Sequence, residues 1–398
     1  MDLTSSIKMK IVYYDKGHQT LLENSNNYDP DFIANMKALV ADGFEISVSD
    51  FVLNSLFHKK QVNSTKYPDR DSLRSSISNT IENMTDYLDI KNNTLVIKKT
   101  CNPTVENRER IGESFAISVI SKIIGVIDAD WDIIPVLPEK AFDFIYSSTG
   151  SKVIQIEAKG CFSNENGKSS SISKHKESII DKKRSIRNDP NHSYKADYYY
   201  GVITKISNSN EITCYLLDPP TSGFKGNSFK IKIKNRLKYY SQFLNLIAPT
   251  SELTKIIINY DNDIYIDNEP LNYKYRSEPY DSFFHQKITF KFDNETVGGS
   301  LIFQKDNFFI FIGLTSSIIN SIAFGKLASF SKTRTKTLKN IEFHIDRYNL
   351  SKSEQEEIEK FIEANPHSSQ LLLNKMHFSG DISISNSGVA IGILSLNY

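Results

Sequence analysis

Two apolar runs decide the fold of this chain: AFDFIYS over residues 141–147 and KVIQIEAK over residues 152–159. Both alternate as half-buried strands do, because successive side chains of a strand point to opposite faces. The segment between them, SSTGS over residues 147–151, has the length and composition of a hairpin turn. We therefore expect two antiparallel neighbouring strands that bring Asp143 towards Glu157 and Lys159.

Alternation also decides which side chains share a face. It places Asp143 opposite Phe142 and Phe144 on the first strand, and it places Glu157 and Lys159 together on the second. The sequence leaves the pairing register of the two strands open.

A helix is expected upstream over residues 106–126, and Glu113 lies on it. Counting by three and four along a helix groups Glu113 with apolar residues, namely Ala116, Ile117, Ile120 and Ile124. An ionised carboxylate on a buried stripe requires an ion pair, a hydrogen bond or a metal. The alternative is a solvated glutamate at the mouth of the helix, where the helix dipole favours negative charge.

The elements around the two strands follow a definite order. Strands are expected at 132–137, 141–147 and 152–159 after the helix at 106–126, and a basic helix at 172–188 is followed by strands at 199–206 and 211–217. Such an order predicts a mixed sheet flanked by helices, an α/β (α+β) fold.

We expect three parts in the chain: an N-terminal α/β accessory domain (1–100), a core (101–222) and a β-rich C-terminal domain for substrate or partner binding (223–398). The first part contains a strand near 9–14 and helices near 31–41, 51–57 and 71–90. In the last part, strands are expected at 229–233, 255–259, 263–266, 287–292, 300–304 and 307–313, and helices at 236–247, 315–324 and 353–364.

Composition excludes several classes of protein. With 39% apolar and 11% aromatic residues among 398, the chain can form real cores. Forty-eight basic residues balance 47 acidic ones, so any affinity for nucleic acid must come from local patches. The 3 cysteines lack CxxC spacing, which argues against a zinc module or a disulfide scaffold. The polar start MDLTSS and the lack of a run of roughly 20 apolar residues predict a cytoplasmic protein.

The residues of the two strands and the helix suit phosphodiester hydrolysis. Asp143 and Glu157 offer the hard oxygen ligands that Mg²⁺ or Mn²⁺ prefers. Lys159 can orient the attacking water and stabilise charge in the transition state. Glu113 could add a ligand or hold a metal-bound water, and the backbone carbonyl of Ala158 could add another.

These residues resemble the signature of the PD-(D/E)xK nuclease superfamily, which includes many restriction endonucleases. The match consists of Glu113, then Asp143, then Glu157-Ala158-Lys159. It extends over residues 106–217, and Phe142 stands where the proline of the signature would be. The resemblance implies a restriction-endonuclease-like core and a Mg²⁺-dependent DNA endonuclease in restriction or anti-phage defence. It also implies a metal at Asp143 and Glu157, and Lys159 as the catalytic lysine.

The expected nuclease activity also suggests protein partners. Cutting both strands of a duplex generally requires two active sites, which favours a homodimer. No phosphate-binding loop motif is present, so an ATPase or helicase would be a separate partner protein. The rival interpretation is a non-catalytic subunit that binds nucleic acid or a partner protein.

Basic residues gather in and before the helix at 172–188. Candidate phosphate contacts are Lys168, Lys174, Lys176, Lys182, Lys183 and Arg187. A solvated helix face explains such a run equally well. A further run over 230–238 has period-two spacing, as expected of an edge strand lined with positive charge.

Overall fold

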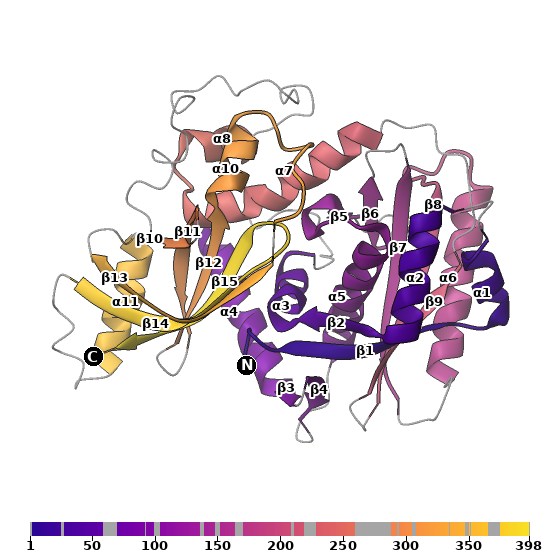
Figure 1. Cartoon of the computed structure of the whole chain (residues 1–398), viewed down its shortest axis with the longest axis horizontal. Helices are drawn as coiled ribbons and strands as arrows, with labels where there is room; N and C mark the ends of the chain where they lie inside the picture. Colours follow the sequence, from indigo (N-terminus) through magenta and orange to yellow (C-terminus); the bar gives the residue numbers. More distant parts are fainter. Residues whose placement is uncertain are drawn as a thin grey trace. The chain divides into compact units, whose positions relative to one another are not determined.

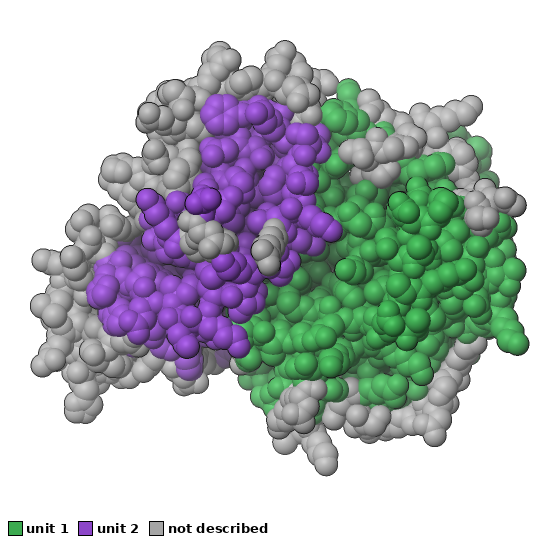
Figure 2. All heavy atoms as spheres, viewed as in Figure 1, with its two compact units in different colours: residues 1–65, 83–236 green, residues 66–82, 237–398 purple. Residues whose placement is uncertain are grey.

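The computed structural model divides the chain into two compact units (Figure 2): residues 1–65 with 83–236, and residues 66–82 with 237–398. Helix α4 (Arg70–Tyr87) and helix α7 (Ser228–Ile247) contribute residues to both. The structure describes residues 2–24, 28–58, 70–91, 93–98, 104–135, 139–147, 152–163, 170–207, 211–218, 228–258, 288–292, 294–304, 308–333, 335–346, 350, 352–364 and 375–397.

A mixed sheet forms the centre of the first unit (Figure 1). Its strands are β1 (Ser6–Tyr13), β2 (Phe44–Ser47), β5 (Trp131–Ile133), β6 (Phe144–Ser147), β7 (Val153–Phe162), β8 (Tyr198–Ile206) and β9 (Ile212–Leu217). They lie in the order β2-β1-β9-β8-β7-β6-β5. The pairs β1–β9 and β7–β8 are parallel, and the other neighbours are antiparallel. The predicted mixed α/β architecture is confirmed.

Helices accompany this sheet. They are α1 (Lys16–Leu22), α2 (Pro30–Asp42), α3 (Val48–Phe57), α5 (Val105–Ile124), the short 3₁₀ helix η1 (Asp128–Asp130) and α6 (Ser170–Asn188); β3 (Leu88–Lys91) and β4 (Thr94–Ile97) form a separate hairpin. Helix α5 begins after Thr104, whose side chain accepts a hydrogen bond from the backbone N–H of Asn107. It ends at Gly125, whose φ of 73° is the left-handed conformation that glycine adopts most readily.

Helices α5 and α6 cover opposite faces of β7 (Figure 1). A Cβ atom at Gly160 would lie 2.0 Å from the carbonyl oxygen of Arg108, so α5 abuts β7 backbone to backbone on that face. A Cβ atom at Gly201 of β8 would lie 2.8 Å from a methyl carbon of Ile179 in α6. Gly201 is paired with Glu157, so alternation turns Glu157 towards α6 and Gly160 towards α5.

The units differ from the three predicted parts of the chain. Strand β1 pairs in parallel with β9 from Lys10–Thr213 to Tyr13–Leu216, so the N-terminal residues extend the sheet of the predicted core. The strand near residue 9 could be recognised from its local pattern. Its partner could not, because strand pairing between residues about 200 positions apart leaves no local signature.

The second unit contains an antiparallel sheet, as the prediction of a β-rich C-terminal region requires. Its strands are β10 (Ile288–Phe292), β11 (Glu295–Phe303), β12 (Phe308–Thr315), β13 (Lys336–Asp346), β14 (Lys375–Ile384) and β15 (Val389–Asn397), in the order β10-β11-β12-β15-β14-β13. Helices α8 (Glu252–Ile258), α10 (Ser316–Ala323) and α11 (Lys352–Ala364) belong to this unit. Phe309, Phe311 and Phe378 lie in its buried core.

Two predicted strands are wrong, because residues 229–233 and 255–259 fall largely within α7 and α8. The alternation of Phe and Ile with Lys over 229–233 is local, whereas the longer pattern is helical. The buried residues recur every three or four positions: Ile233, Leu237, Tyr240, Leu244 and Ile247. The predicted edge strand of lysines over 230–238 is therefore part of a helix. The strand predicted at 263–266 lies outside the described residues.

A membrane-spanning helix is not found in the parts of the chain that the structure describes: none of their helices has the length and apolar character required.

Candidate active site

The antiparallel pair of strands predicted from residues 141–159 is present, and it brings two acids together; residues 148–151 of the predicted turn lie outside the described residues. Phe144 pairs with Ile156 across the antiparallel strands, and the backbone N–H of Asp143 donates to the carbonyl oxygen of Ile156 at 3.0 Å. The next opposed position therefore joins Asp143 and Glu157, whose side chains share the face of the sheet turned towards α6.

Asp143 is held by the backbone of the strand that carries Glu157. Its side chain is 5% exposed, and its Oδ2 atom accepts a hydrogen bond of 2.9 Å from the backbone N–H of Ala158. This bond fixes the carboxylate beside Glu157 and stabilises its charged form. Ala158, whose carbonyl was a predicted ligand, thus contributes its N–H to the site.

Glu157 is fully buried, and two lysines reach the same oxygen of it. The Nζ atoms of Lys159 and Lys182 each lie 2.6 Å from its Oε1 atom. Its Oε2 atom has no hydrogen-bond partner. Burial raises the pKa of Glu157, the charge of Asp143 raises it further, and the two lysines oppose the shift. A carboxylate in this position requires positive charge beside it in order to ionise.

Lys159 remains a cation at this site. Burial alone would lower the pKa of its ammonium, but the charges of Glu157 and Asp143 outweigh burial and raise the pKa above its usual range. Its side chain is 23% exposed, so the ammonium lies where the buried acids meet solvent. Glu109 of α5 also contributes to the raised pKa.

Gln155 is a site residue that the motif did not single out. It lies two positions before Glu157 on the same face of β7, is 0% exposed, and neither atom of its side-chain amide has a hydrogen-bond partner. Buried amides are almost always hydrogen-bonded, to protein or to ordered water. The amide of Gln155 and Oε2 of Glu157 are therefore buried polar groups on one face of β7 that have no hydrogen-bond partner within the protein. Alternation along β7 was the signal that could have identified Gln155.

Glu113 lies on α5, and α5 covers the other face of the sheet. It is 9% exposed and follows Gly112, where a Cβ atom would come within 2.6 Å of the backbone nitrogen of Gly160. The predicted burial of this glutamate is confirmed, and the solvated alternative is excluded. Within the described ranges, no three His, Cys, Asp or Glu side chains are grouped so as to hold a metal. Glu113 is therefore not assembled with Asp143 and Glu157 into a three-carboxylate group.

The predicted phosphate contacts on α6 differ in exposure: some side chains face solvent and others point inward. Lys174 and Arg187 are exposed, as a contact to nucleic acid requires. Lys176 lies 4.7 Å from the ring centre of Tyr14 and 3.9 Å from a carboxylate oxygen of Asp15. Lys168 lies outside the residues that the structure describes.

The other two lysines point inward. Lys182 is bound to Glu157, as described above. Lys183 is 6% exposed and donates a hydrogen bond to the backbone carbonyl of Asp218, and its burial lowers the pKa of its ammonium to about 8. The prediction of Lys183 as a phosphate contact is wrong, because helical spacing places it between Ile179 and Ile186 on the buried stripe of α6.

His175 is a second neighbour that sequence reasoning left aside. It lies seven residues before Lys182 on the same side of α6. Burial lowers the pKa of its imidazole, and the charge of Lys159 lowers it further. His175 is therefore a neutral donor or acceptor beside Lys159 near neutral pH.

The donor set at the hairpin is compatible with Mg²⁺ or Mn²⁺. Both ions prefer carboxylate oxygens and keep part of their water shell. Asp143 and Glu157 supply two buried carboxylates, and Oε2 of Glu157 lacks a partner. Gln155 could hold a water of the ion. These residues fit the metal that the sequence predicts.

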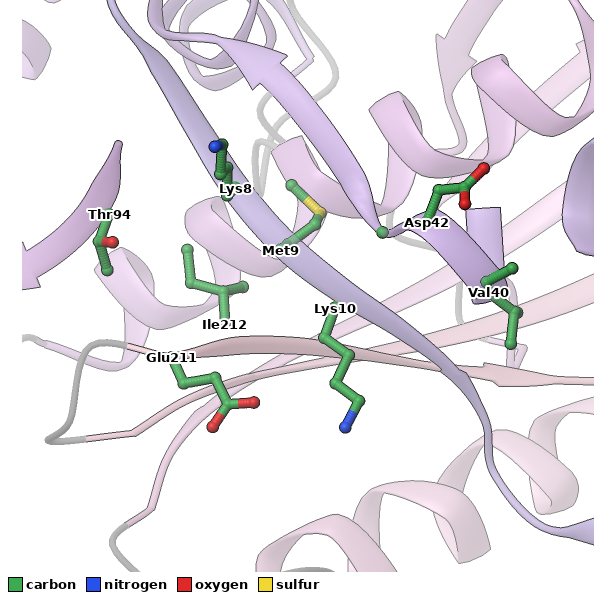
Figure 3. Close-up of a pocket in the computed structure, with 10 residues that line it drawn as sticks. Lys8, Met9, Lys10, Val40, Asp42, Thr94, Glu211 and Ile212 are labelled. Carbon is green, nitrogen blue, oxygen red and sulfur yellow. The ribbon is translucent and has the colours of Figure 1, made fainter. Parts of the chain in front are cut away.

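A separate hollow lies on the same unit, formed by other residues (Figure 3). Its volume is about 520 Å³, and its lining includes Lys8 and Lys10 of β1, Asp42 of α2, and Glu211 beside β9. Charges of both signs line it, which gives it no preference for an anion or a cation. None of the predicted catalytic residues belongs to it.

Comparisons with models of protein families, with curated proteins and with solved structures find no match for this chain.

Proposed function

We propose that this protein is a metal-dependent nuclease that hydrolyses phosphodiester bonds in DNA, with the hairpin of β6 and β7 as its active site. One observation carries the proposal: two buried carboxylates, Asp143 directly before β6 and Glu157 on β7, lie opposite one another beside the ammonium of Lys159. One oxygen of Glu157 lacks a partner.

Energetics favour a functional origin for this arrangement. Burying an ionised carboxylate costs several kcal/mol unless its charge and lone pairs are satisfied. At Glu157 the charge is balanced, but a lone-pair oxygen and the nearby amide of Gln155 are not satisfied. Such a cost is retained where the group has chemistry to perform.

Each residue then has a defined task. Asp143 and Glu157 would hold Mg²⁺ or Mn²⁺, and the bond from the Ala158 N–H keeps the carboxylate of Asp143 in place. When bound, the metal supplies charge neutralisation at the scissile phosphate and a more acidic water. Lys159 orients the attacking water by hydrogen bonding and stabilises the negative charge that develops on the phosphate.

The order of elements supports a restriction-endonuclease-like core. Helix α5 is followed by the antiparallel strands β5, β6 and β7; α6 then crosses over to β8, which is parallel to β7. The two helices cover opposite faces of β7, and the paired acids lie where the chain enters β6 and on the neighbouring strand β7. Exposed Lys174 and Arg187 on α6 could contact the backbone of DNA on the same face.

The test is incubation of the purified protein with plasmid, linear duplex and single-stranded DNA, in the presence of Mg²⁺, Mn²⁺ or EDTA. We expect cleavage with either metal and none with EDTA, and loss of cleavage in Asp143→Asn. Asp181→Asn, which removes an exposed carboxylate from α6, is the matched control and should cleave normally. Equal cleavage by Asp143→Asn and the parent protein, or cleavage in EDTA, would refute the proposal.

A non-catalytic role gives a different pattern. A subunit that only binds DNA would retain affinity in every variant and cleave no substrate with either metal. DNA binding measured beside cleavage therefore separates the two functions.

A further inference from the structure

We infer that Lys182 of α6 is a displaceable counter-cation of the metal site. It forms an ion pair with Glu157 when no metal is bound, and it moves to the substrate phosphate when a divalent metal binds. This inference rests on the proposed function and adds a second lysine to it. The predicted signature contains only Lys159 as the lysine of the site.

The two buried carboxylates of the site are matched in charge only if Lys182 is counted. Asp143 and Glu157 supply two negative charges, and Lys159 and Lys182 supply two positive ones. A divalent ion on the same carboxylates would bring two further positive charges into a buried region. Repulsion at that point favours departure of one ammonium, and the phosphate of a substrate supplies the negative charge that it would then meet.

Both lysines share one oxygen, and this makes one of them replaceable. Each Nζ atom lies 2.6 Å from Oε1 of Glu157. Lys159 is in addition stabilised by Asp143 and Glu109, so it has other partners in the site. Lys182 forms its ion pair with Glu157. Lys182 is therefore the ammonium that a metal displaces at the lower cost.

The position of Lys182 allows it to move without disturbing the fold. Its side chain is 21% exposed, so the ammonium already reaches solvent on a flexible four-carbon stem. The helix below it is anchored by other residues: Ile179 and Ile186 are buried, and Lys183 is bound to the carbonyl of Asp218. Movement of Lys182 would thus change one side chain and leave α6 in place.

Binding of Mn²⁺ without nucleic acid tests the first half of the inference. Titration at pH 8, followed by the electron paramagnetic resonance signal of free Mn²⁺, would compare the parent protein with Lys182→Gln, Lys182→Arg, Glu157→Gln and Arg184→Gln. The substitution Arg184→Gln removes one positive charge from the same helix, as Lys182→Gln does. The side chain of Arg184 is 68% exposed. We expect Lys182→Gln to bind Mn²⁺ about tenfold more tightly, because a competing cation is lost. Lys182→Arg and Arg184→Gln should bind it as the parent does.

Binding of a short DNA duplex tests the second half. With Ca²⁺ in place of Mg²⁺, Lys182→Gln should bind the duplex about tenfold more weakly than Arg184→Gln, since one close phosphate contact is lost. In EDTA the two variants should bind the duplex equally. Without a metal, Lys182 of Arg184→Gln stays paired with Glu157 and makes no phosphate contact that Lys182→Gln could lose. Thermal unfolding of each variant, with Lys182→Arg as the charge-conserving reference, shows whether the fold is retained.

The outcomes separate this inference from the proposed function. If the parent protein binds Mn²⁺ no better than Glu157→Gln, the metal site and the inference both fail. If Glu157→Gln abolishes Mn²⁺ binding but Lys182→Gln matches Arg184→Gln or binds Mn²⁺ more weakly, the metal site stands and the inference is overturned. Equal duplex binding by Lys182→Gln and Arg184→Gln in Ca²⁺ also overturns it.

Discussion

Glu157 in the first unit and Glu354 in the second are both buried, and each faces two cationic side chains, yet their surroundings differ. Glu354 Oε1 accepts hydrogen bonds from the hydroxyl of Ser300 and, at 3.1 Å, from the N–H of Leu301, with Arg70 and Arg74 at 3.6 and 3.8 Å. Glu157 is bound by lysines alone among its described partners, and one of its oxygens lacks a hydrogen bond.

The contrast distinguishes two uses of a buried acid. A carboxylate that accepts hydrogen bonds from a backbone N–H and a hydroxyl, with guanidinium groups as ion-pair partners, is satisfied within the fold, and removing it damages the fold. A carboxylate with an unpartnered oxygen beside movable ammonium groups is incomplete without a ligand. We therefore interpret Glu354 as structural and Glu157 as part of the proposed active site.

The largest expected effect is on cleavage. Glu157→Gln should lower the rate of DNA cleavage by about a thousandfold or more, because the metal loses a charged ligand. The folded state should be retained, since the substitution also removes a buried charge. Measuring single-turnover cleavage beside urea unfolding checks both parts. If Glu157→Gln is strongly destabilised but its folded molecules cleave DNA at the parent rate, the contrast with Glu354 is contradicted.

The reverse pattern is expected at Glu354. Glu354→Ala should lower the free energy of unfolding by about 3 kcal/mol, because the buried guanidinium of Arg74 and the partly buried one of Arg70 lose their carboxylate. Glu356→Ala on the same helix, where the carboxylate is 54% exposed, should change it by less than about 0.5 kcal/mol. Urea denaturation followed by circular dichroism measures both. A negligible effect at Glu354 would remove the structural half of the comparison.

Lys159 should matter for rate more than for stability. Lys159→Gln should reduce cleavage about a hundredfold through loss of transition-state stabilisation, while Lys159→Arg retains part of the activity because it keeps the charge. Turnover at saturating DNA is the measurement. If the Km for DNA rises and kcat stays unchanged, Lys159 contributes to binding alone.

A separate effect concerns pH and Lys183, which lies next to Lys182 on α6. Burial lowers the pKa of Lys183 from 10.5 to about 8. Between these values the unfolded chain binds the proton and the folded chain does not, so Lys183 makes the free energy of unfolding rise as pH rises from about 8 to 10.5. Urea unfolding at several pH values should show this rise in the parent protein and a smaller one in Lys183→Met. If the free energy of unfolding rises equally with pH in the parent protein and in Lys183→Met, the lowered pKa of Lys183 is contradicted.

The sequence predicted the central hairpin well, because the information needed was local. Alternation over 141–159 fixed the faces of Asp143, Glu157 and Lys159, and the turn between the runs fixed their antiparallel direction. The helix at 172–188 was equally clear from its isoleucine spacing, and its observed bounds are 170–188. Whether this site binds metal and cleaves DNA stays a prediction.

What escaped prediction depends on contacts distant in sequence. Lys182 lies 25 residues from Glu157, and nothing in its helix distinguishes it from Lys174 or Arg187 until α6 is packed on β7. Strands β13, β14 and β15 were not recognised, although they form half of the second sheet. Long-range pairing and burial decide such features, and neither is visible in a window of a few residues.

The parallel pairing of β1 with β9 has a practical consequence for anyone who wishes to isolate the proposed catalytic residues on a fragment. A fragment starting at residue 101 would contain every proposed catalytic residue, yet it would leave the outer side of β9 without its neighbour. An uncovered strand edge recruits other chains and promotes aggregation. Insolubility of such a fragment would thus report a missing strand, and the smallest piece fit for enzymology must keep the first strand of the chain.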